Sequence, residues 1–242
     1  MINRLKPLST LFDQLVNRES TAGRCVTCLD APAYHGLCAP CRADLPHNCL
    51  HCDTCALPLA FAGPVRRCGE CLTSPPPFTR SLIPWRYQFP VDSMIGRYKY
   101  HGQRKFARPL LADFGDYLEQ KLDDSEHPEL LIPAPMHWLR RWQRGFNQAQ
   151  DIAEHVGARL DIPVGSKAVR RRRQVRAQRG LNRSGRLTNL NKVFEVCTPI
   201  PERVAIVDDV VTTGATTRAL ARALTEAGAR DIQIWALART PG

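Results

Sequence analysis

Residues 204–217, VAIVDDVVTTGATT, decide the fold. The apolar run Val204–Val207 is typical of a strand that is buried on both faces. Two carboxylates, Asp208 and Asp209, come directly after it, and a threonine- and glycine-rich loop leads into a predicted helix over 213–227. In open α/β sheets, ligands bind outside the carboxyl ends of the strands. A helix N-terminus adds backbone N–H groups and partial positive charge, which suit phosphate. The stretch therefore predicts a site for a phosphorylated ligand.

A helix start alone does not explain this stretch, because it contains two adjacent acids. An N-capped helix after an ordinary strand would account for one threonine, but not for Asp208 and Asp209 followed by Thr-Thr-Gly-Ala-Thr. Gly214 would let the backbone approach a ligand closely. The stretch has neither the GxxxxGK[ST] pattern of a P-loop nor the GxGxxG pattern of dinucleotide-binding folds. We expect the carboxylates to lie where ribose hydroxyls or a hydrated Mg²⁺ would sit.

Helices and apolar runs alternate along the rest of the chain after residue 80. The helical segments expected before the deciding stretch are 94–100, 107–121 and 147–160, with breaks near Gly102 and Pro109. Strands are expected at 130–132, weakly at 164–169, at 204–207 and at 232–237. Such alternation predicts an α/β fold with a parallel sheet flanked by helices.

Nine of the ten cysteines lie between residues 25 and 71. Eight of them form four CxxC pairs, and two such pairs supply the four thiolates of a tetrahedral zinc site. The sequence thus predicts a small double zinc ribbon over 23–73 with two structural zinc ions, since so short a segment has too little core to fold alone. Sequential pairing gives the following two ligand sets: Cys25, Cys28, Cys38 and Cys41; Cys52, Cys55, Cys68 and Cys71.

Other readings of the cysteines stay open at this point. A cross-braced pairing has the same spacing, an iron–sulfur cluster is a minor alternative, and Cys49 or a nearby histidine could replace a ligand. A disulfide framework would need an oxidising compartment. Residues 1–22 follow the spacing of a short amphipathic helix and lack the apolar core of a secretory signal, and the chain has no apolar run long enough for a membrane span. We therefore expect a cytoplasmic protein.

The net charge of +11 is concentrated in one segment. Residues 137–192 contain 14 lysines and arginines but 3 acids, and the rest of the chain is balanced. A segment of this kind predicts a polyanionic ligand: a nucleic acid, an acidic lipid or a phosphorylated metabolite. The run Arg170–Arg173 within it could also be no more than a solvated surface.

The stretch 204–217 closely resembles the phosphoribosyl pyrophosphate (PRPP) signature of type I phosphoribosyltransferases. Together with the cysteine pairs, the chain resembles the ComF family, the competence protein F relatives, which include GntX-type proteins linked to the use of DNA as a nutrient. The resemblance covers about residues 24–240. It is supported by further matching segments: Tyr98–Gly102, Pro133–His137, Arg144–Gln148, and the basic stretch Arg170–Asn191.

This resemblance implies a type I phosphoribosyltransferase-like domain over 80–242, preceded by the ribbons. Asp208 and Asp209 would hold the ribose hydroxyls of PRPP, and Thr212, Thr213, Gly214, Ala215 and Thr216 would cradle its 5-phosphate. The loop Ala134, Pro135, Met136 and His137 would meet the pyrophosphate. The implied flexible basic stretch, with Arg144, Arg171, Arg173 and Gln178, would close over the site. Mg²⁺ would arrive with PRPP and be held mostly by the ligand's own oxygens.

Two further classes of function compete with a PRPP-dependent transferase. The chain could be an accessory factor that binds single-stranded DNA and contacts proteins of the DNA-uptake machinery, or a PRPP-sensing regulator without catalysis. The acid pair argues against DNA binding alone, because carboxylates repel phosphate. Glutamine-dependent amination is not expected, since Met1 is followed by Ile2 and no glutaminase domain with an N-terminal cysteine fits.

Overall fold

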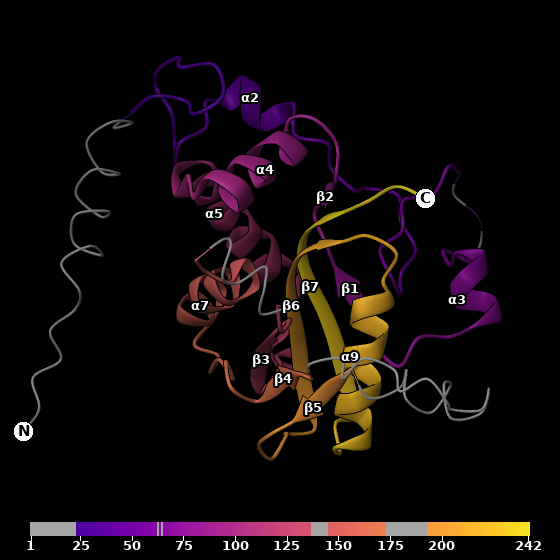
Figure 1. Cartoon of the computed structure of the whole chain (residues 1–242). Coiled ribbons are helices and arrows are strands. Elements are labelled where there is room, and N and C mark those ends of the chain that lie inside the picture. Colours follow the sequence, from indigo (N-terminus) through magenta and orange to yellow (C-terminus); the bar gives the residue numbers. More distant parts are fainter. Residues whose placement is uncertain (1–22, 62, 64, 137–144, 173–192) are drawn as a thin grey trace, which may run out of the picture.

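A parallel sheet lies at the centre of the fold (Figure 1). The computed structural model describes residues 23–61, 63, 65–136, 145–172 and 193–242. Within these residues the sheet has five strands in the order β1-β7-β6-β3, and β2 also pairs with β7. All of the pairings are parallel, which confirms the predicted α/β class. The strands are β1 (Arg80–Leu82), β2 (Trp85–Arg86), β3 (Leu130–Pro133), β6 (Arg203–Val211) and β7 (Asp231–Arg239).

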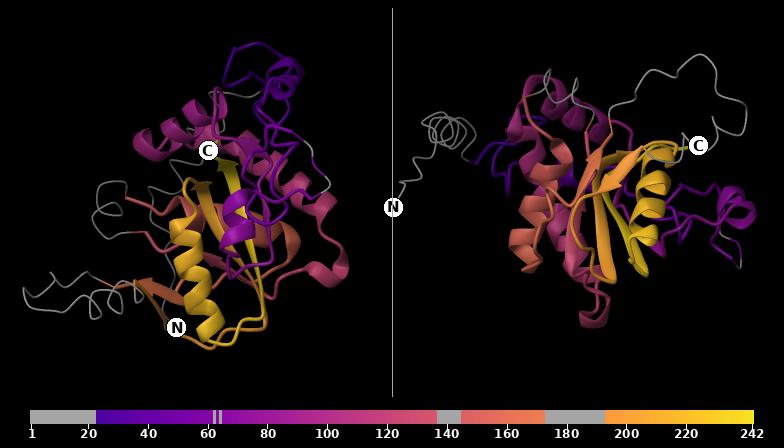
Figure 2. Two further views of the ribbon diagram at one scale, coloured as in Figure 1. Left: turned by 90° about the vertical axis from the view of Figure 1, so that its right-hand side faces the viewer. Right: turned by 60° about the horizontal axis from the view of Figure 1, so that its bottom comes forward.

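Helices cover both faces of this sheet (Figure 2). On one face, α4 (Val91–His101), α5 (Arg104–Lys121) and α7 (Gln148–Leu160) pack with Val207 and Trp235 in one hydrophobic cluster. On the other face, α9 (Ala215–Glu226) packs with Ile206 and Ile234 in a second cluster. The sheet is therefore buried on both sides, which suits the apolar runs Val204–Val207 of β6 and Ile234–Ala238 of β7.

Local capping residues account for the start of α7 and the end of α4. Asn147 caps α7 by accepting a hydrogen bond from the N–H of Ala149 at 3.2 Å, and Gly102 ends α4 with a left-handed φ of 61°. The predicted break at Pro109 is wrong, because α5 runs through it. Pro109 is buried, and its ring lies against Gly36 of the cysteine-rich segment (residues 23–73). This packing keeps Pro109 within α5, although a proline has no N–H that could donate a helix hydrogen bond.

The weak strand predicted over 164–169 forms only at its end. Val164 makes an isolated parallel bridge to Leu131, whereas β4 (Val169–Arg171) pairs antiparallel with β5 (Phe194–Val196). The polar loop before β3 contains the short 3-10 helix η1 (Asp124–Glu126). None of the helices in the described ranges has the length and apolarity needed to cross a membrane.

The first part of the cysteine-rich segment lies beside α4 and α5, and its later part lies near β1 and α9 (Figure 1). It carries two short helices, α2 (Ala39–Ala43) and α3 (Gly69–Thr73). Val26 and Leu37 belong to the same hydrophobic cluster as α4 and α5. The helix expected over 1–22 falls outside the described residues, and the domain boundaries at 23–73 and 80–242 remain a prediction.

Candidate functional site

The acid pair Asp208 and Asp209 lies inside β6. The sequence predicted that the strand ends before these residues, which is wrong: β6 continues to Val211 because it stays paired with β7 as far as Arg239. The neighbouring strand β3 pairs with β6 only up to Val207. The acids therefore extend beyond the carboxyl end of β3, at the edge where α/β sheets bind ligands.

Lys99 of α4 reaches this acid pair. Its Nζ lies 2.9 Å from Oδ2 of Asp209, and each side chain is 13% exposed. The Lys99 ammonium also lies 6.0 Å from the centre of the Tyr87 ring. A buried carboxylate is costly without a partner, so this ion pair stabilises Asp209 in the absence of ligand.

Asp208 is held differently from its neighbour. Its Oδ1 accepts a hydrogen bond from the backbone N–H of Asp209 at 2.8 Å. Burial raises the pKa of Asp208 to about 7, and the negative charge of Asp209 acts in the same direction. A cationic or hydroxyl-bearing ligand beside Asp208 would therefore favour the charged form of this carboxyl.

The predicted phosphate loop (Thr212–Thr216) follows β6 and is largely exposed. Gly214 has a left-handed φ of 75°, the backbone geometry that favours glycine, and precedes the first residue of α9. The helix starts at Ala215, two residues later than predicted. Thr217 donates to the carbonyl of Gly214 at 2.8 Å, and Thr213 accepts from the N–H of Ala215 at 3.3 Å. Thr212, Thr213, Ala215 and Thr216 are exposed, so the threonine hydroxyls can meet an anion at the start of α9.

The predicted pyrophosphate loop begins beside the acid pair. The N–H of Ala134 donates to the carbonyl of Val207 at 2.8 Å, and the Ala134 carbonyl accepts from the Asn147 side chain at 3.3 Å. Pro135 and Met136 follow and are partly exposed. The structure thus brings Ala134 to the same sheet edge as Asp208, whereas His137 lies outside the described residues.

The basic stretch is only partly described. Arg171 is exposed at the end of β4, while Arg170 and Arg172 both pair with Glu195, at 2.9 and 3.0 Å. One carboxylate is therefore shared by two arginines of the positive segment, and the group of three keeps a net positive charge. The other predicted residues of this stretch lie outside the described ranges: Arg144, Arg173 and Gln178.

The eight predicted zinc ligands form two clusters with sequential pairing. Within each cluster the sulfur atoms all lie within 4.8 Å of one another. We call them the first site (Cys25, Cys28, Cys38, Cys41) and the second site (Cys52, Cys55, Cys68, Cys71). In the described part of the chain, neither Cys49 nor a histidine joins a cluster.

The chemistry of both clusters suits zinc. Burial alone would raise the pKa of Cys25, but backbone N–H groups of Cys28 and Cys38 hold it at about 6. The N–H groups around Cys52 likewise hold its pKa at about 7 against the effect of burial. Turns that aim N–H groups at sulfur favour thiolates, and four converging thiolates are the ligand set of a closed structural zinc site. Such a site leaves no open position for catalysis.

Comparison with known proteins agrees with this arrangement. Competence protein F from Haemophilus influenzae is 33% identical over 226 residues, which cover 89% of this chain and 96% of that protein. The chain belongs to the competence protein F family. DNA utilization protein YhgH of Escherichia coli K12 is 30% identical over 213 residues, covering 87% of this chain and 93% of YhgH.

Two further comparisons add less. No family model matches the chain. A purine phosphoribosyltransferase from Pyrococcus horikoshii aligns with 55% of this chain and 72% of its own, with 19% identity and a TM-score of 0.34, which is too low for a conclusion.

In this member of the competence protein F family, two features of the site were not predicted. The first is a cluster that joins α4 to the start of α7. The Tyr98 hydroxyl donates to Asp151 at 3.0 Å, and Arg104 pairs with the same carboxylate at 3.2 Å. Phe146 lies against both, 5.3 Å from the Tyr98 ring. The cluster fixes the segment after residue 144 relative to Lys99, and no spacing rule links such distant residues.

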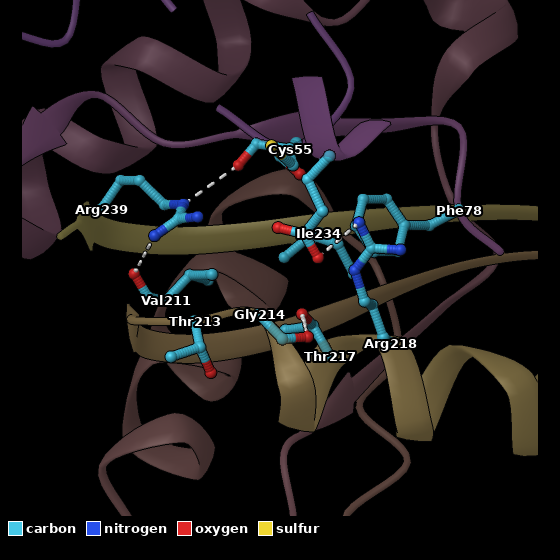
Figure 3. A pocket seen from close by; sticks show the side chains of 11 residues that line it. Cys55, Phe78, Val211, Thr213, Gly214, Thr217, Arg218, Ile234 and Arg239 are labelled. Carbon is cyan, nitrogen blue, oxygen red and sulfur yellow. Dashed lines mark hydrogen bonds and ion pairs between the residues drawn. The ribbon is translucent and has the colours of Figure 1, made fainter. Parts of the chain in front are cut away.

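The second unpredicted feature is a buried arginine beside the phosphate loop. Arg239 is 4% exposed and lines a pocket with Cys55, Thr213 and Gly214 (Figure 3). Arg218 lines the same pocket from α9. From the sequence, a lone arginine at the end of an apolar strand is expected to be exposed. No sequence pattern therefore predicts the burial of Arg239 beside the phosphate loop.

Proposed function

We propose that this chain binds PRPP together with Mg²⁺ and acts as a phosphoribosyltransferase in the use of DNA or of nucleotides derived from it. The observation that carries the proposal is the acid pair at the open sheet edge, beside the exposed phosphate loop and within reach of Lys99. The names of the relatives, competence protein and DNA utilization protein, supply the link to DNA.

Each part of the site has a task in this chemistry. The exposed N–H and hydroxyl groups of the phosphate loop would bind the 5-phosphate. The carboxylates of Asp208 and Asp209 would accept hydrogen bonds from the ribose hydroxyls and favour the positive charge that develops on the ring as the C1–O bond breaks. The Lys99 ammonium, released from Asp209 by the ribose, would move toward the negative leaving group.

Mg²⁺ bound with PRPP would supply positive charge that favours the departure of the pyrophosphate. It would be held chiefly by oxygens of the ligand, so the chain needs few ligands of its own. The loop that starts at Ala134 would orient the pyrophosphate. No nucleophilic side chain is required, because the acceptor attacks C1 directly.

Thermal denaturation tests this proposal. PRPP with Mg²⁺, at a hundredfold excess over its Kd, should raise the Tm of the wild type by about 5 °C or more. The double variant Asp208→Asn with Asp209→Asn should lose that rise, because neutral amides no longer match the ribose hydroxyls and the developing charge. Asp116→Asn, at an acid that pairs with Arg159 away from the site, is the control and should keep the rise. An unchanged Tm for the wild type at millimolar PRPP would rule the proposal out.

Single-stranded DNA is the second candidate ligand. Arg171 is exposed within the positive segment, and a solvated arginine of this kind suits a phosphate backbone. If DNA binds here, its affinity should fall steeply with salt and should weaken when Arg170 to Arg173 are replaced by alanine. We also expect the chain to contact proteins of the DNA-uptake machinery, and to do so in the cytoplasm. A screen for pyrophosphate release with bases, amines and oligonucleotides as acceptors separates an enzyme from a PRPP-binding accessory factor.

A further inference from the structure

The Arg239 side chain carries a buried positive charge that is satisfied by backbone carbonyls. Its Nε donates to the carbonyl of Cys55 at 3.2 Å. Its terminal N–H groups donate to the carbonyls of Val211 at 3.1 Å and Thr240 at 3.0 Å, and also to that of Thr212. No carboxylate of the described residues forms an ion pair with it. A buried guanidinium needs such strong acceptors, so these carbonyls are held in place around it.

These carbonyls belong to two different parts of the site. Cys55 is a ligand of the second site, whereas Val211 and Thr212 are the residues from which the phosphate loop starts. A metal ion that fixes the Cys55 sulfur restricts the backbone of the same knuckle. One side chain therefore joins a metal knuckle to the entry of the phosphate loop.

Arg218 makes a second connection, from the other end of the loop. It lies in the first turn of α9, which the phosphate loop leads into, and its side chain is 12% exposed. It pairs with Glu70 at 3.1 Å and donates to the carbonyl of Ser74 at 2.9 Å. Glu70 sits in α3 between the ligands Cys68 and Cys71. The two knuckles of the second site are thus tied to the two ends of the phosphate loop. Figure 3 shows Arg239 between Cys55 and Val211, with Arg218 on the other side of the pocket.

The ion pair beside the first site connects that site to a helix of the core and not to the phosphate loop. Arg42 of α2, beside the ligand Cys41, pairs with Asp113 of α5 at 2.9 Å. Gly36, between the two knuckles of that site, lies against Pro109 of the same helix. This pair resembles Arg218–Glu70 in chemistry and length, but it holds a helix of the core, so it provides a matched control.

We propose that Arg239 and Arg218 are positioning residues through which metal binding at the second site sets the geometry of the phosphate loop. The inference rests on the proposed function, since the loop is taken to bind the phosphate of PRPP. Zinc in the second site holds both knuckles, the knuckles hold the two arginines, and the arginines hold the loop. Coupling of this kind is reciprocal, so a bound phosphate also strengthens the hold of the second site on its metal.

Amide hydrogen exchange of the zinc-loaded, full-length chain tests the proposal directly. The variants Arg239→Gln and Arg218→Gln should speed exchange of the amides over 211–217 by about tenfold, the effect of losing a hydrogen bond to a charged group. Arg42→Gln should leave these amides unchanged. Arg218→Lys, which can still pair with Glu70, should give a smaller increase than Arg218→Gln. Amides of α7 should exchange alike in all variants, which checks that the core is folded.

The affinity for PRPP with Mg²⁺, measured by calorimetry at the zinc content of the wild type, provides the second readout. The Kd should rise about tenfold in Arg239→Gln and Arg218→Gln but stay unchanged in Arg42→Gln. Should Arg239→Gln fail to fold, Arg218→Gln and Glu70→Gln still decide the matter.

The two proposals fail in different ways. Equal loop exchange in Arg218→Gln and Arg42→Gln would overturn the positioning role, whether or not PRPP binds. A wild type that does not bind PRPP, but whose loop exchange responds to Arg218→Gln as expected, would overturn the proposed function and support the positioning role.

Discussion

The two four-cysteine sites are built alike, from two CxxC pairs each, yet they have different surroundings. Cys25 and Cys38 of the first site lie in the hydrophobic cluster that also holds α4, α5 and α7. Cys52, Cys68 and Cys71 of the second site form a small cluster of their own with Leu57 and Leu59. The first site thus belongs to the core, while the second is connected to the phosphate loop by polar side chains. A duplicated motif acquires separate roles through what each copy contacts.

Equivalent cysteine variants give the largest expected effect. Cys38→Ser and Cys68→Ser each remove the third ligand of a site, at side chains that are 5% and 6% exposed. Cys38→Ser should lower the free energy of unfolding by several kcal/mol, because loss of the metal also disrupts the main core. Cys68→Ser should lower it less, but should abolish the rise in Tm that PRPP causes. Urea unfolding followed by tryptophan fluorescence measures the first quantity, and thermal denaturation the second. Equal losses of stability in the two variants would contradict the comparison.

A smaller effect is expected from pH, at an acid that belongs to neither metal site. Burial raises the pKa of Asp208 from 3.8 to about 7 in the folded chain. Between these values the folded protein keeps a proton that the unfolded chain releases, so stability falls as pH rises from about 4 to about 7 and then levels off. Asp208→Asn should remove this fall, and its Tm should gain a few degrees relative to the wild type across that range. Asp231→Asn, at a strand residue that accepts from Thr79, should follow the wild-type profile.

The smallest effect should come from the ion pair of the first site. Arg42→Gln removes a partly exposed pair with Asp113, so the free energy of unfolding should fall by about 1 kcal/mol. Urea unfolding measures this loss, with Arg66→Gln as a control that removes the more exposed pair with Asp53. A loss as large as that of Cys38→Ser would mean that the pair, rather than the metal, holds the first site to the core.

The features that the sequence predicted are those with a local cause. The strand at Val204–Val207, the helix start at Asn147 and the break at Gly102 each depend on a few neighbouring residues. The sequential pairing of the cysteines was one of the open alternatives, and the two clusters decide it. The acids, the loop after them and Ala134 lie at one edge of the sheet, while their roles toward a ligand stay a prediction.

What could not be predicted depends on residues far apart in the chain. The continuation of β6 through Asp208 and Asp209 is caused by its pairing with β7. Pro109 stays helical because it is buried against a glycine of the cysteine-rich segment. Arg239 and Cys55 are 184 residues apart, and neither residue type predicts a contact with the other. Local propensity carries no information about such contacts.

The edge of the sheet at β2 has a consequence for how the chain folds. The outward N–H of Arg86 donates to the carbonyl of Pro46, the N–H of Asn48 donates to the carbonyl of Pro84, and His47 bridges Trp85. Residues 46–48, which lie between the two metal sites in the sequence, therefore cap an edge strand that would otherwise present free backbone groups. A newly made chain that has not yet captured its metal would expose this edge to strand addition by other chains. Metal capture would thus protect the protein from aggregation before any ligand is bound.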